Sequence, residues 1–576
     1  MSASPRARRI SVRSVVDAGT PVGRRLCRLA PLLDRVLGIN ELDELYHRNA
    51  LAGLPPHRFA TEALQSLGAT VAGGDDMANR LPTEGPVIVV ANHPHGGIEG
   101  LIMVQLIAAL RPDVKIMANL ALGVFKELTP NFLFVNPLNA SDPTNGRGLR
   151  ESLRQLRSGG VLVMFPAGRT SFYQADLGCI ADSEWSRATT ILARKTGAPI
   201  LPMRFTGRNS KLFYRLGDVW YRFRLLMLAR ELLNTRNKTV ELVVGRPFDP
   251  ELFSGVEDAT LTDVMRLATT TLQPARTSQP SRPAVEPYKL APAGDRSLIA
   301  AELEALPRAQ RVLETRGFIV GFGNQAQFPN LMADIARERE RTFRMLDEGS
   351  GAPTDSDAFD ADFDQLYCWD QSSEALVGAY RIGRRDRLLA GTGSYLEQMF
   401  DFDPAFFAER APALELGRSF VTPPFQRSRH SLDFLWRGIG GYLRAHPHYG
   451  TLYGTVSLSR QYDPVSIAMM AATLIAPGDR KVRARQAMED VLGSEWQRFC
   501  LRHDVDLALL NALVAAREQD GKSIPVLLRH YAGLGAEFHA VGVDSNFAAT
   551  PGLLLSVDLS ALPAAKHKRY IAHRPY

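Results

Sequence analysis

Residues 91–100 read ANHPHGGIEG and follow directly on the apolar run GPVIVV at 85–90. A short continuous apolar run of this kind is typical of a strand that is buried on both faces. Two histidines, a glycine pair and a glutamate therefore gather where a buried strand ends. This junction of strand and polar cluster indicates how the first half of the chain folds.

Apolar runs and helical patterns alternate along this half of the chain. The strand candidates are 86–91, 113–118, 161–168, 198–207 and 239–248, and the helix candidates include 99–111 and 147–160. Such alternation predicts an α/β sheet. Ligands of these sheets bind beyond the carboxyl ends of the strands, which is where the polar cluster stands.

The cluster contains a candidate catalytic pair. His93 follows Asn92 at the strand exit, and Glu99 lies six residues beyond His93. Gly96 and Gly97 allow a tight turn that brings Glu99 back toward an imidazole. A histidine oriented by a carboxylate can act as a general base on a hydroxyl that attacks an acyl group.

Two alternatives stand beside this interpretation. His95 also lies near Glu99 and competes for the role of base. A contact between histidine and glutamate that only holds a turn would give the same pattern.

A second cluster, MFPAGRTS at 164–171, again follows a strand candidate. It places Pro166, Gly168 and Arg169 on a loop over the same sheet edge. The guanidinium of Arg169 could bind an anionic carboxylate or phosphate through paired hydrogen bonds.

With both clusters in place, residues 80–250 resemble the lysophospholipid acyltransferase family of glycerolipid acyltransferases. The resemblance implies O-acylation with His93 as base, Glu99 orienting it and Arg169 near the acceptor, and it assigns substrate contacts to Asn92, Gly97, Pro166 and Gly168. Two features depart from the family pattern. Five residues separate His93 from its acid, which is Glu where Asp is usual, and Ala167 replaces the usual glutamate of the second block.

The stretch QPARTSQPSRPAVEPYKLAPA at 273–293 carries no periodic apolar face, so it reads as a linker. The predicted division is a basic N-terminal arm with a possible membrane-surface helix at 1–45, an O-acyltransferase domain at 46–272, a Pro-rich linker at 273–298 and a second domain at 299–576. The fold class is α/β in two domains, the second of them α+β.

The second half shows a helix pattern, an antiparallel strand pair, a central strand and another helix. In the central strand Glu415 and Arg418 lie three apart, so they face opposite sides unless the strand bulges. Burying a carboxylate there costs free energy, so a charged partner or a catalytic role is expected for it. It could form an internal ion pair with Arg381 or Arg341, or it could accept a proton from an amine that attacks a thioester.

Residues 315–560 resemble the GNAT N-acyltransferases, in the branch near N-acyl-homoserine-lactone synthases and ornithine N-acyltransferases. The motifs are RTFRM with Arg341 and Phe343, GAYRIG with Arg381, and ELGRSF with Glu415 and Arg418. The resemblance implies Glu415 as the base and the other four as substrate contacts. The donor in that branch is commonly an acyl-acyl carrier protein. The glycines of the coenzyme A loop are missing from QRSRHS at 426–431, although acyl-coenzyme A stays the alternative donor.

Composition indicates the kind of partner. The chain has 68 Lys+Arg against 61 Asp+Glu, a net charge of +7. This excess favours an acidic partner, either a membrane surface or a carrier protein, and no motif points to nucleic acid. The most apolar stretch, 464–477, is too short to span a bilayer and is interpreted as a core helix. We expect a cytoplasmic protein, peripheral on the inner face of the cell membrane, with no bound cofactor and no metal.

A chain that combines these two halves resembles the bifunctional ornithine-lipid synthases. The two resemblances imply N-acylation of an amino acid with a 3-hydroxyacyl chain, followed by O-acylation of the resulting lyso-lipid. One alternative is a glycerophospholipid O-acyltransferase fused to an N-acyltransferase for another amine, such as glycine. Another is a catalytically idle protein that binds membranes or a carrier protein.

Overall fold

The structure is a computed structural model. It describes residues 21–136, 141–175, 177–219, 222–274, 288–428, 430–478 and 481–572, together with residues 11, 13, 19 and 139. The chain forms two compact units. Unit 1 combines residues 1–279 with residues 492–521, and unit 2 combines residues 280–491 with residues 522–576.

Unit 1 is built on a sheet that has seven strands within the described residues. In spatial order these are β1 (Thr70–Ala72), β9 (Thr239–Val244), β8 (Ile200–Phe205), β2 (Val87–Ala91), β5 (Val161–Met164), β3 (Lys115–Asn119) and β4 (Phe132–Val135). The strands from β8 to β4 run parallel, and β9 pairs with β8 in the antiparallel sense. Every residue of β2 is buried, as expected of a central parallel strand.

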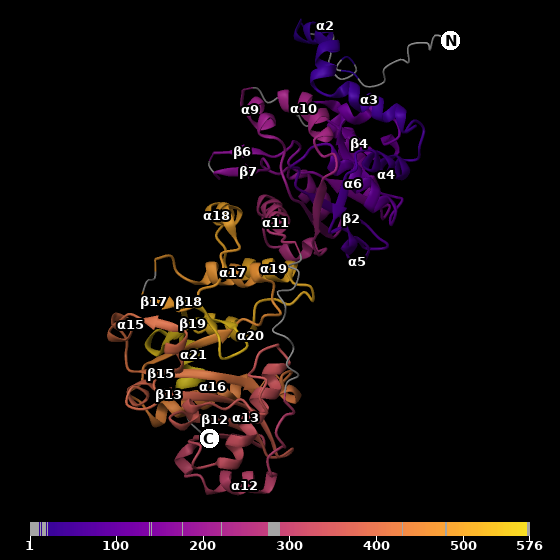
Figure 1. Cartoon of the computed structure of the whole chain (residues 1–576). Helices are drawn as coiled ribbons and strands as arrows, with labels where there is room; N and C mark the ends of the chain where they lie inside the picture. The colour runs from indigo at the N-terminus through magenta and orange to yellow at the C-terminus, as the bar shows by residue number, and fades with distance from the viewer. Residues whose placement is uncertain are drawn as a thin grey trace. The chain divides into compact units, whose positions relative to one another are not determined.

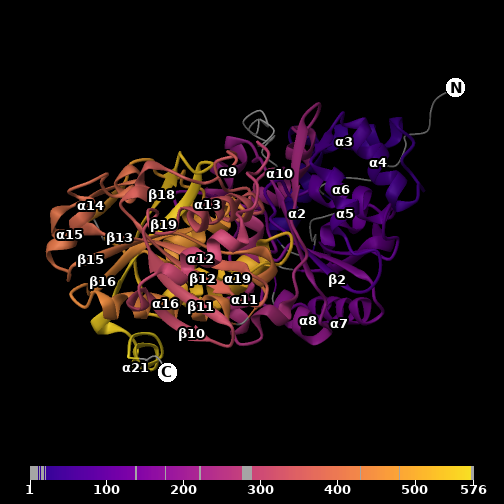
Figure 2. The ribbon, with the colours of Figure 1, turned by 90° about the horizontal axis from the view of Figure 1, so that it is seen from below.

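Helices cover both faces of this sheet. Val87 and Val89 of β2 pack with Ile102 of α6 (Ile98–Ala108) and Phe59 of α4 (Pro56–Ser66) in one core. Helices α7 (Pro143–Arg157) and α8 (Ala188–Thr196) lie on the other side of β2 (Figure 2). The alternation of strands and helices predicted for this half is therefore confirmed.

The other α-helices of unit 1 within residues 21–274, and one hairpin, lie around this core. They are α2 (Pro21–Val36), α3 (Ile39–Arg48), α5 (Met77–Arg80), α9 (Lys211–Val219), α10 (Arg222–Leu233), α11 (Asp258–Thr270) and the hairpin of β6 (Phe172–Gln174) and β7 (Cys179–Ala181). None of the helices in the described residues combines the length and the hydropathy that a bilayer-spanning helix needs.

Unit 2 contains a second sheet, with eight strands among the described residues. In spatial order they are β10 (Arg311–Thr315), β11 (Phe318–Gly323), β12 (Asp364–Asp370), β13 (Ala375–Arg384), β15 (Ala413–Val421), β16 (Thr451–Ser457), β19 (Thr550–Asp558) and β18 (Glu537–Asp544). Strands β15 and β16 run parallel and pair only from Ala413 to Leu416. Beyond Leu416 the two strands diverge.

Two long helices lie on opposite faces of this sheet. Helix α13 (Pro329–Arg344) places Phe343 against Phe420 of β15. Helix α16 (Ser431–Ala445) packs so closely on the other face that a Cβ at Gly438 would lie 2.5 Å from Val320. The other elements are α12 (Arg296–Ala305), α14 (Arg385–Leu388), α15 (Pro404–Ala408), α17 (Pro464–Leu474), α20 (Val526–Ala532), α21 (Ala564–Lys566) and the pair β14 (Phe400–Phe402) and β17 (Val482–Ala484).

The apolar stretch at 464–477 contains α17. Val465, Ile467 and Met470 of this helix are buried. The interpretation of this stretch as a core helix is confirmed.

The division of the chain differs from the predicted one at two places. Residues 492–521, hereafter the insert, hold α18 (Gly493–Arg502) and α19 (Leu507–Arg517), and they belong to unit 1 although they lie within the predicted second domain. Figure 1 shows α18 close to α11. Residues 288–298, predicted as linker, pack in unit 2, where Tyr288 N donates to Gly351 O over 3.0 Å. Residues 275–287 of the predicted linker lie outside the described residues.

Candidate active sites

The loop of residues 92–97, hereafter the His93 loop, connects the end of β2 to α6. Asn92 fixes its start, because Asn92 Nδ2 donates to Phe205 O over 2.9 Å and Asn92 Oδ1 accepts from Phe205 N over 2.7 Å. These two bonds tie the end of β2 to the end of β8. The loop is thereby held at the carboxyl edge of the parallel strands.

Glu99 lies beneath this loop and is fully buried. Its carboxylate accepts from His95 N over 2.6 Å and from Gly96 N over 2.7 Å. His93 Nδ1 lies 3.6 Å from Glu99 Oε1. Glu99 therefore holds the turn and also faces the imidazole of His93, so both interpretations of the pattern describe part of the geometry.

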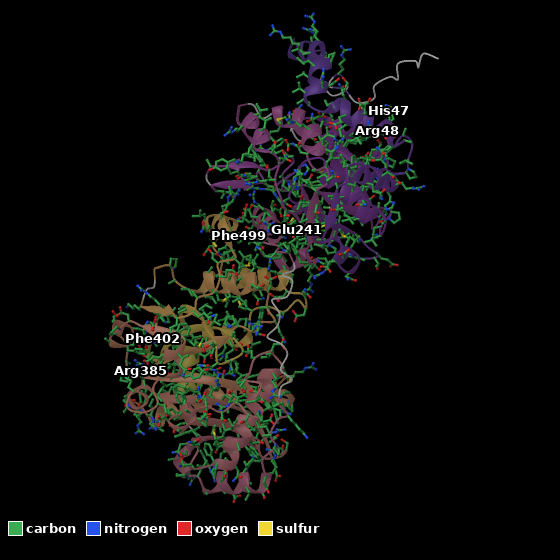
Figure 3. All side chains as sticks on the ribbon, viewed as in Figure 1. His47, Arg48, Glu241, Arg385, Phe402 and Phe499 are labelled. Atoms are coloured by element: carbon green, nitrogen blue, oxygen red, sulfur yellow. The ribbon has the colours of Figure 1, made fainter. Side chains whose placement is uncertain are left out.

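The two histidines have different surroundings. His95 Nε2 lies 2.9 Å from the carbonyl oxygen of Thr206, whose hydroxyl donates to Glu241 over 2.9 Å (Glu241 is labelled in Figure 3). The ring of His93 packs on Phe165 with 4.5 Å between ring centroids, and within the described residues its Nδ1 has no hydrogen-bond partner. The side chain of His93 is 17% exposed. Both rings are half-buried, and that of His93 is the one whose buried Nδ1 is left without a hydrogen-bond partner among the described residues.

The second cluster lies beside the first. Ser171 N donates to His93 O over 2.8 Å, which joins the two loops. Pro166 is buried, whereas Gly168 and Arg169 are exposed. The guanidinium of Arg169 lies 5.0 Å from the ring centroid of Phe172, and that of Arg224 lies 4.8 Å from the same ring. The exposed end of this site is therefore basic.

Asp182 is a buried residue that the sequence analysis did not single out. Its carboxylate accepts from His93 N over 3.3 Å, from Ser171 Oγ over 2.5 Å and from Trp185 Nε1 over 3.1 Å. Burial raises the pKa of Asp182, and these hydrogen bonds oppose that shift. No local pattern could reveal the role, because 89 residues separate Asp182 from His93.

An apolar cavity of about 100 Å³ opens beside the His93 loop. Its wall is formed mainly by side chains of α3, α4 and α6 and includes Leu42, Leu45, Phe59, Gly97, Gly100 and Leu122. A Cβ built at Gly97 would meet nothing within 4 Å. Gly97 therefore lines the cavity without filling the space beside it.

In unit 2, Glu415 lies in β15 with 2% of its surface exposed. Its carboxylate accepts from Ser394 Oγ over 2.5 Å, from Tyr453 OH over 3.0 Å and from Leu396 N over 3.3 Å. Burial raises the pKa of Glu415. Among the described residues no guanidinium bonds to it, so the internal ion pair considered from the sequence is not formed.

A bulge in β15 changes where Arg418 points. Arg418 has a φ of 47°, and the pairing register shifts between Ala379 and Arg381 of the neighbouring β13. Arg418 donates to Tyr395 OH over 3.2 Å and lies 3.2 Å from Asp355. The alternation of an ordinary strand would have placed Arg418 on the face opposite Glu415. The bulge brings it to Tyr395, the neighbour of the serine that bonds to Glu415.

Arg381 completes this charged cluster. Its guanidinium lies 2.7 Å from Asp357 and 3.4 Å from Asp360. Although burial lowers the pKa of Arg418, the carboxylates of Asp355 and Asp357 outweigh this effect and raise it. Both arginines are therefore held by acidic partners inside the unit.

Arg341 and Phe343 of α13, which were predicted to contact substrate, lie outside the charged cluster. Arg341 is 35% exposed and pairs with Glu338, whereas Arg339, only 1% exposed, lies 3.0 Å from Asp360 and joins the cluster. Residues two apart on a helix face nearly opposite directions, so choosing between them required the packing of the helix. Phe343 packs on Phe547 with 4.9 Å between centroids, as part of an aromatic core.

Glu348 is another buried carboxylate that the sequence analysis did not single out. It is 5% exposed and accepts from Ser457 Oγ, at the end of β16, over 3.1 Å. Burial raises the pKa of Glu348 to about 7. Ser457 lies beyond Gly454, the last residue of β16 that pairs with β15. Glu348 therefore lies beside the part of β16 that has separated from β15.

In the part of the chain that the structure describes, no group of three or more His, Cys, Asp and Glu side chains is placed to bind a metal ion. The features that could receive a substrate are the apolar cavity beside Gly97, the exposed guanidinium of Arg169 and the divergence of β15 from β16.

Comparisons with known proteins match this arrangement. Residues 17–252 match the family model described as acyltransferase, and residues 339–437 match the model of the acetyltransferase (GNAT) domain. The predicted order, an acyltransferase α/β domain followed by a GNAT domain, is confirmed.

Three relatives cover different parts of the chain. The glycine N(alpha)-acyltransferase of Bacteroides thetaiotaomicron is 29% identical, over 40% of this chain and 74% of its own length. The lyso-glycine lipid O-acyltransferase of Phocaeicola vulgatus is 29% identical, over 30% of this chain and 63% of its own length. The L-ornithine N(alpha)-acyltransferase of Agrobacterium fabrum is 26% identical, over 46% of this chain and 90% of its own length. By these matches the chain joins an acyltransferase domain to a GNAT domain and is an enzyme that transfers acyl groups.

Proposed function

We propose that the chain is a bifunctional aminolipid synthase. Unit 2 N-acylates an amino acid with a 3-hydroxyacyl chain, and unit 1 acylates the 3-hydroxyl group of the lyso-lipid that results. The observation that carries the proposal is the imidazole of His93, which lies 3.6 Å from the buried Glu99 on a loop whose Gly97 lines an apolar cavity. A base next to an apolar cavity suits acyl transfer to a lipid hydroxyl.

In the O-acylation step, His93 Nδ1 carries the proton and faces the carboxylate of Glu99. His93 Nε2 accepts the proton of the lyso-lipid hydroxyl while the oxygen of that hydroxyl attacks the thioester carbonyl. The new C–O bond forms as the C–S bond breaks, and the departing thiolate takes the proton from the imidazolium. The apolar cavity beside Gly97 receives the acyl chain, and the basic end at Arg169 and Arg224 faces the acidic groups of the lipid.

In the N-acylation step, Glu415 accepts a proton from the ammonium of the amino acid, directly or through a water molecule, and the neutral amine that results attacks the thioester carbonyl. The C–N bond forms as the C–S bond of the donor breaks, and the departing thiolate takes the second proton from the nitrogen. Burial, which raises the pKa of Glu415, favours this proton uptake. The hydroxyls of Ser394 and Tyr453 keep the carboxylate in place.

Ornithine is the amine that the charge of this cluster favours. The cluster around Tyr395 holds the guanidiniums of Arg339, Arg381 and Arg418, and it holds the carboxylates of Asp355, Asp357, Asp360 and Asp544. The carboxylates outnumber the guanidiniums, and the carboxylate of Glu415, which interacts with Arg381, adds to the acidic excess. A second ammonium group on the substrate reduces this excess, whereas glycine, the amine in the alternative function, has none.

An acyl carrier protein thioester is the donor that the surface charge favours. Families of both kinds use acyl donors such as acyl-coenzyme A or acyl-acyl carrier protein. The net charge of +7 suits an acidic carrier protein, and QRSRHS at 426–431 lacks the glycines of a coenzyme A loop.

Helix α2 supports a peripheral position on the inner face of the cell membrane. Leu29, Leu32 and Val36 are exposed by 53%, 61% and 56%, and their spacing places them on one face of the helix. Arg28 and Arg35 are also exposed. An apolar face flanked by arginines suits a helix that lies in the surface of an anionic membrane.

The proposal is tested by exchanging each histidine in the full chain. His93→Ala should lower O-acylation of lyso-ornithine lipid by about 10²–10⁴-fold, because the hydroxyl loses its base. His95→Ala should have a milder effect, since His95 bonds to a backbone carbonyl. Mass spectrometry of the products made with acyl carrier protein thioester measures both.

The acceptor is settled in the same assay. Lyso-glycine lipid and lysophosphatidate, supplied in place of lyso-ornithine lipid, test the alternative acceptors. An active His93→Ala beside an inactive His95→Ala would refute the assignment of the base. No turnover by the unaltered protein on any acceptor would favour the idle binding protein.

A further inference from the structure

The insert is attached to unit 1 by a paired ionic contact. Arg266 of α11 is 2% exposed, and its Nε and Nη2 donate to the two carboxylate oxygens of Glu495 in α18 over 3.0 and 2.9 Å. A bidentate pair of this kind fixes both distance and orientation. Phe499 of the same helix, labelled in Figure 3, is buried and stacks with Trp496.

The same arginine also reaches toward the His93 loop. Arg266 Nη1 donates to the carbonyl oxygen of Ser183 over 2.7 Å. Ser183 follows Asp182, whose carboxylate accepts the backbone N–H of His93. Ser183 Oγ also donates to Ala167 O over 3.0 Å, within the loop that carries Arg169. A short path therefore runs from Glu495 through Arg266 and residues 182–183 to both catalytic loops.

The segment of residues 179–184, which contains this path, has other contacts with the insert. Arg502 pairs with Glu184, and Ser494 Oγ lies 3.8 Å from Cys179 Sγ. The segment thus lies between α18 on one side and the His93 loop on the other. Contacts on both sides therefore fix the position of this segment.

We propose that α18 is a positioning element of the O-acylation site, with Glu495 acting on His93 through Arg266 and Asp182. This inference rests on the proposed role of His93 as the base. Because the insert comes from the second half of the chain, the O-acylation site is complete only in a chain whose second half has been made. The arrangement links the second acylation to the presence of the unit that performs the first.

The test uses the full-length protein and compares Glu495→Ala with Glu495→Gln and His503→Ala. His503 is a matched control, because it bonds to Asp263 of α11 over 2.8 Å and makes no contact with residues 179–184 that the structure describes. Glu495→Ala should lower kcat for O-acylation by about ten- to a hundredfold, since small misplacements of a base have effects of this size. KM for the acyl donor should change by less than about twofold, because the apolar cavity is formed by other helices.

Glu495→Gln keeps a hydrogen-bonding side chain of the same shape and should restore part of kcat. N-acylation by the same samples should stay unchanged, which shows that the protein is folded. Hydrogen exchange at the amides of residues 91–100 and 180–186 should become at least about tenfold faster in Glu495→Ala and not in His503→Ala.

Unchanged kcat and unchanged exchange in Glu495→Ala would overturn the proposal. An equal loss in His503→Ala would also overturn it, because the insert would then act only as general support. If His93→Ala retains O-acylation, the proposed function fails. The exchange measurement, which needs no activity, would still decide whether Glu495 positions the His93 loop.

Discussion

Four of the buried carboxylates in the two candidate sites have no guanidinium bonded to them among the described residues, and each has different partners. Glu99 accepts two backbone N–H groups, Asp182 bonds to the His93 loop, Glu415 is enclosed by two hydroxyls, and Glu348 has one serine. Burial raises the pKa of Asp182, Glu415 and Glu348. Perturbed carboxylates of this kind concentrate at functional sites, which is consistent with both proposed reactions.

Glu348 gives a prediction for the dependence of stability on pH. Its pKa is raised from the ordinary value of 4.5 to about 7. Between these two values the folded state holds a proton that the unfolded state has lost, so the stability contributed by Glu348 is full below pH 4.5 and is lost as the pH rises to about 7. Glu348→Gln removes this titration. The free energy of unfolding of the variant relative to the wild type should rise by about 3 kcal/mol across that interval.

Urea unfolding at a series of pH values measures this difference. Glu314→Gln is the control, because it removes a carboxylate that is 60% exposed in the same unit. Parallel curves for Glu348→Gln and the wild type would mean that Glu348 does not titrate in this interval.

At the scale of single elements, α2 has two faces with different surroundings. Ala30 packs in unit 1 with Leu33, whereas Leu29, Leu32 and Val36 remain exposed on another face. The sequence left open whether this segment is a membrane-surface helix or an ordinary surface helix. Its exposed apolar face favours the membrane surface.

The double variant Leu29→Glu with Leu32→Glu should bind anionic vesicles about a hundredfold more weakly than the wild type. Each leucine that enters the interface contributes ~1.5 kcal/mol or more. Sedimentation with vesicles that contain anionic lipid measures the partition, and high salt should release the wild-type protein as well. Leu501→Glu, at a leucine that is 88% exposed in α18, is the matched control. Unchanged binding of the double variant would exclude α2 as the membrane contact.

At the scale of the whole molecule, the two candidate sites lie in separate units of one chain. A lyso-lipid made in unit 2 and used in unit 1 would meet its next site at a high effective concentration. Under the proposed function, fusion of the two enzymes would favour completion of the lipid over release of the lyso-lipid.

Glu415→Gln in the full chain tests whether the two sites act independently. N-acylation should fall by about 10²–10⁴-fold, because an amide cannot take the amine proton. O-acylation of lyso-ornithine lipid supplied from outside should remain, since His93 and Glu99 are unaltered. Thermal unfolding checks that the variant is folded. Loss of both activities in a folded variant would contradict the two-site proposal.

Local pattern alone determined much of this architecture. The alternation of apolar runs predicted the α/β sheet of unit 1, and the glycine pair after His95 predicted the turn that brings Glu99 back toward His93. These features depend on neighbours in sequence, through hydrogen-bond geometry and the burial period of strands and helices. Glu415 could likewise be predicted to be buried, because it lies in an otherwise apolar strand.

Only the tertiary structure decided the rest. Asp182 meets His93 across 89 residues of chain, and Arg418 reaches Tyr395 only because β15 bulges against β13. Nothing in the local sequence of the insert shows that it packs with unit 1. Long-range packing selects among partners that local sequence leaves equivalent, because the burial of an apolar face and the pairing of a charge depend on which surface meets them.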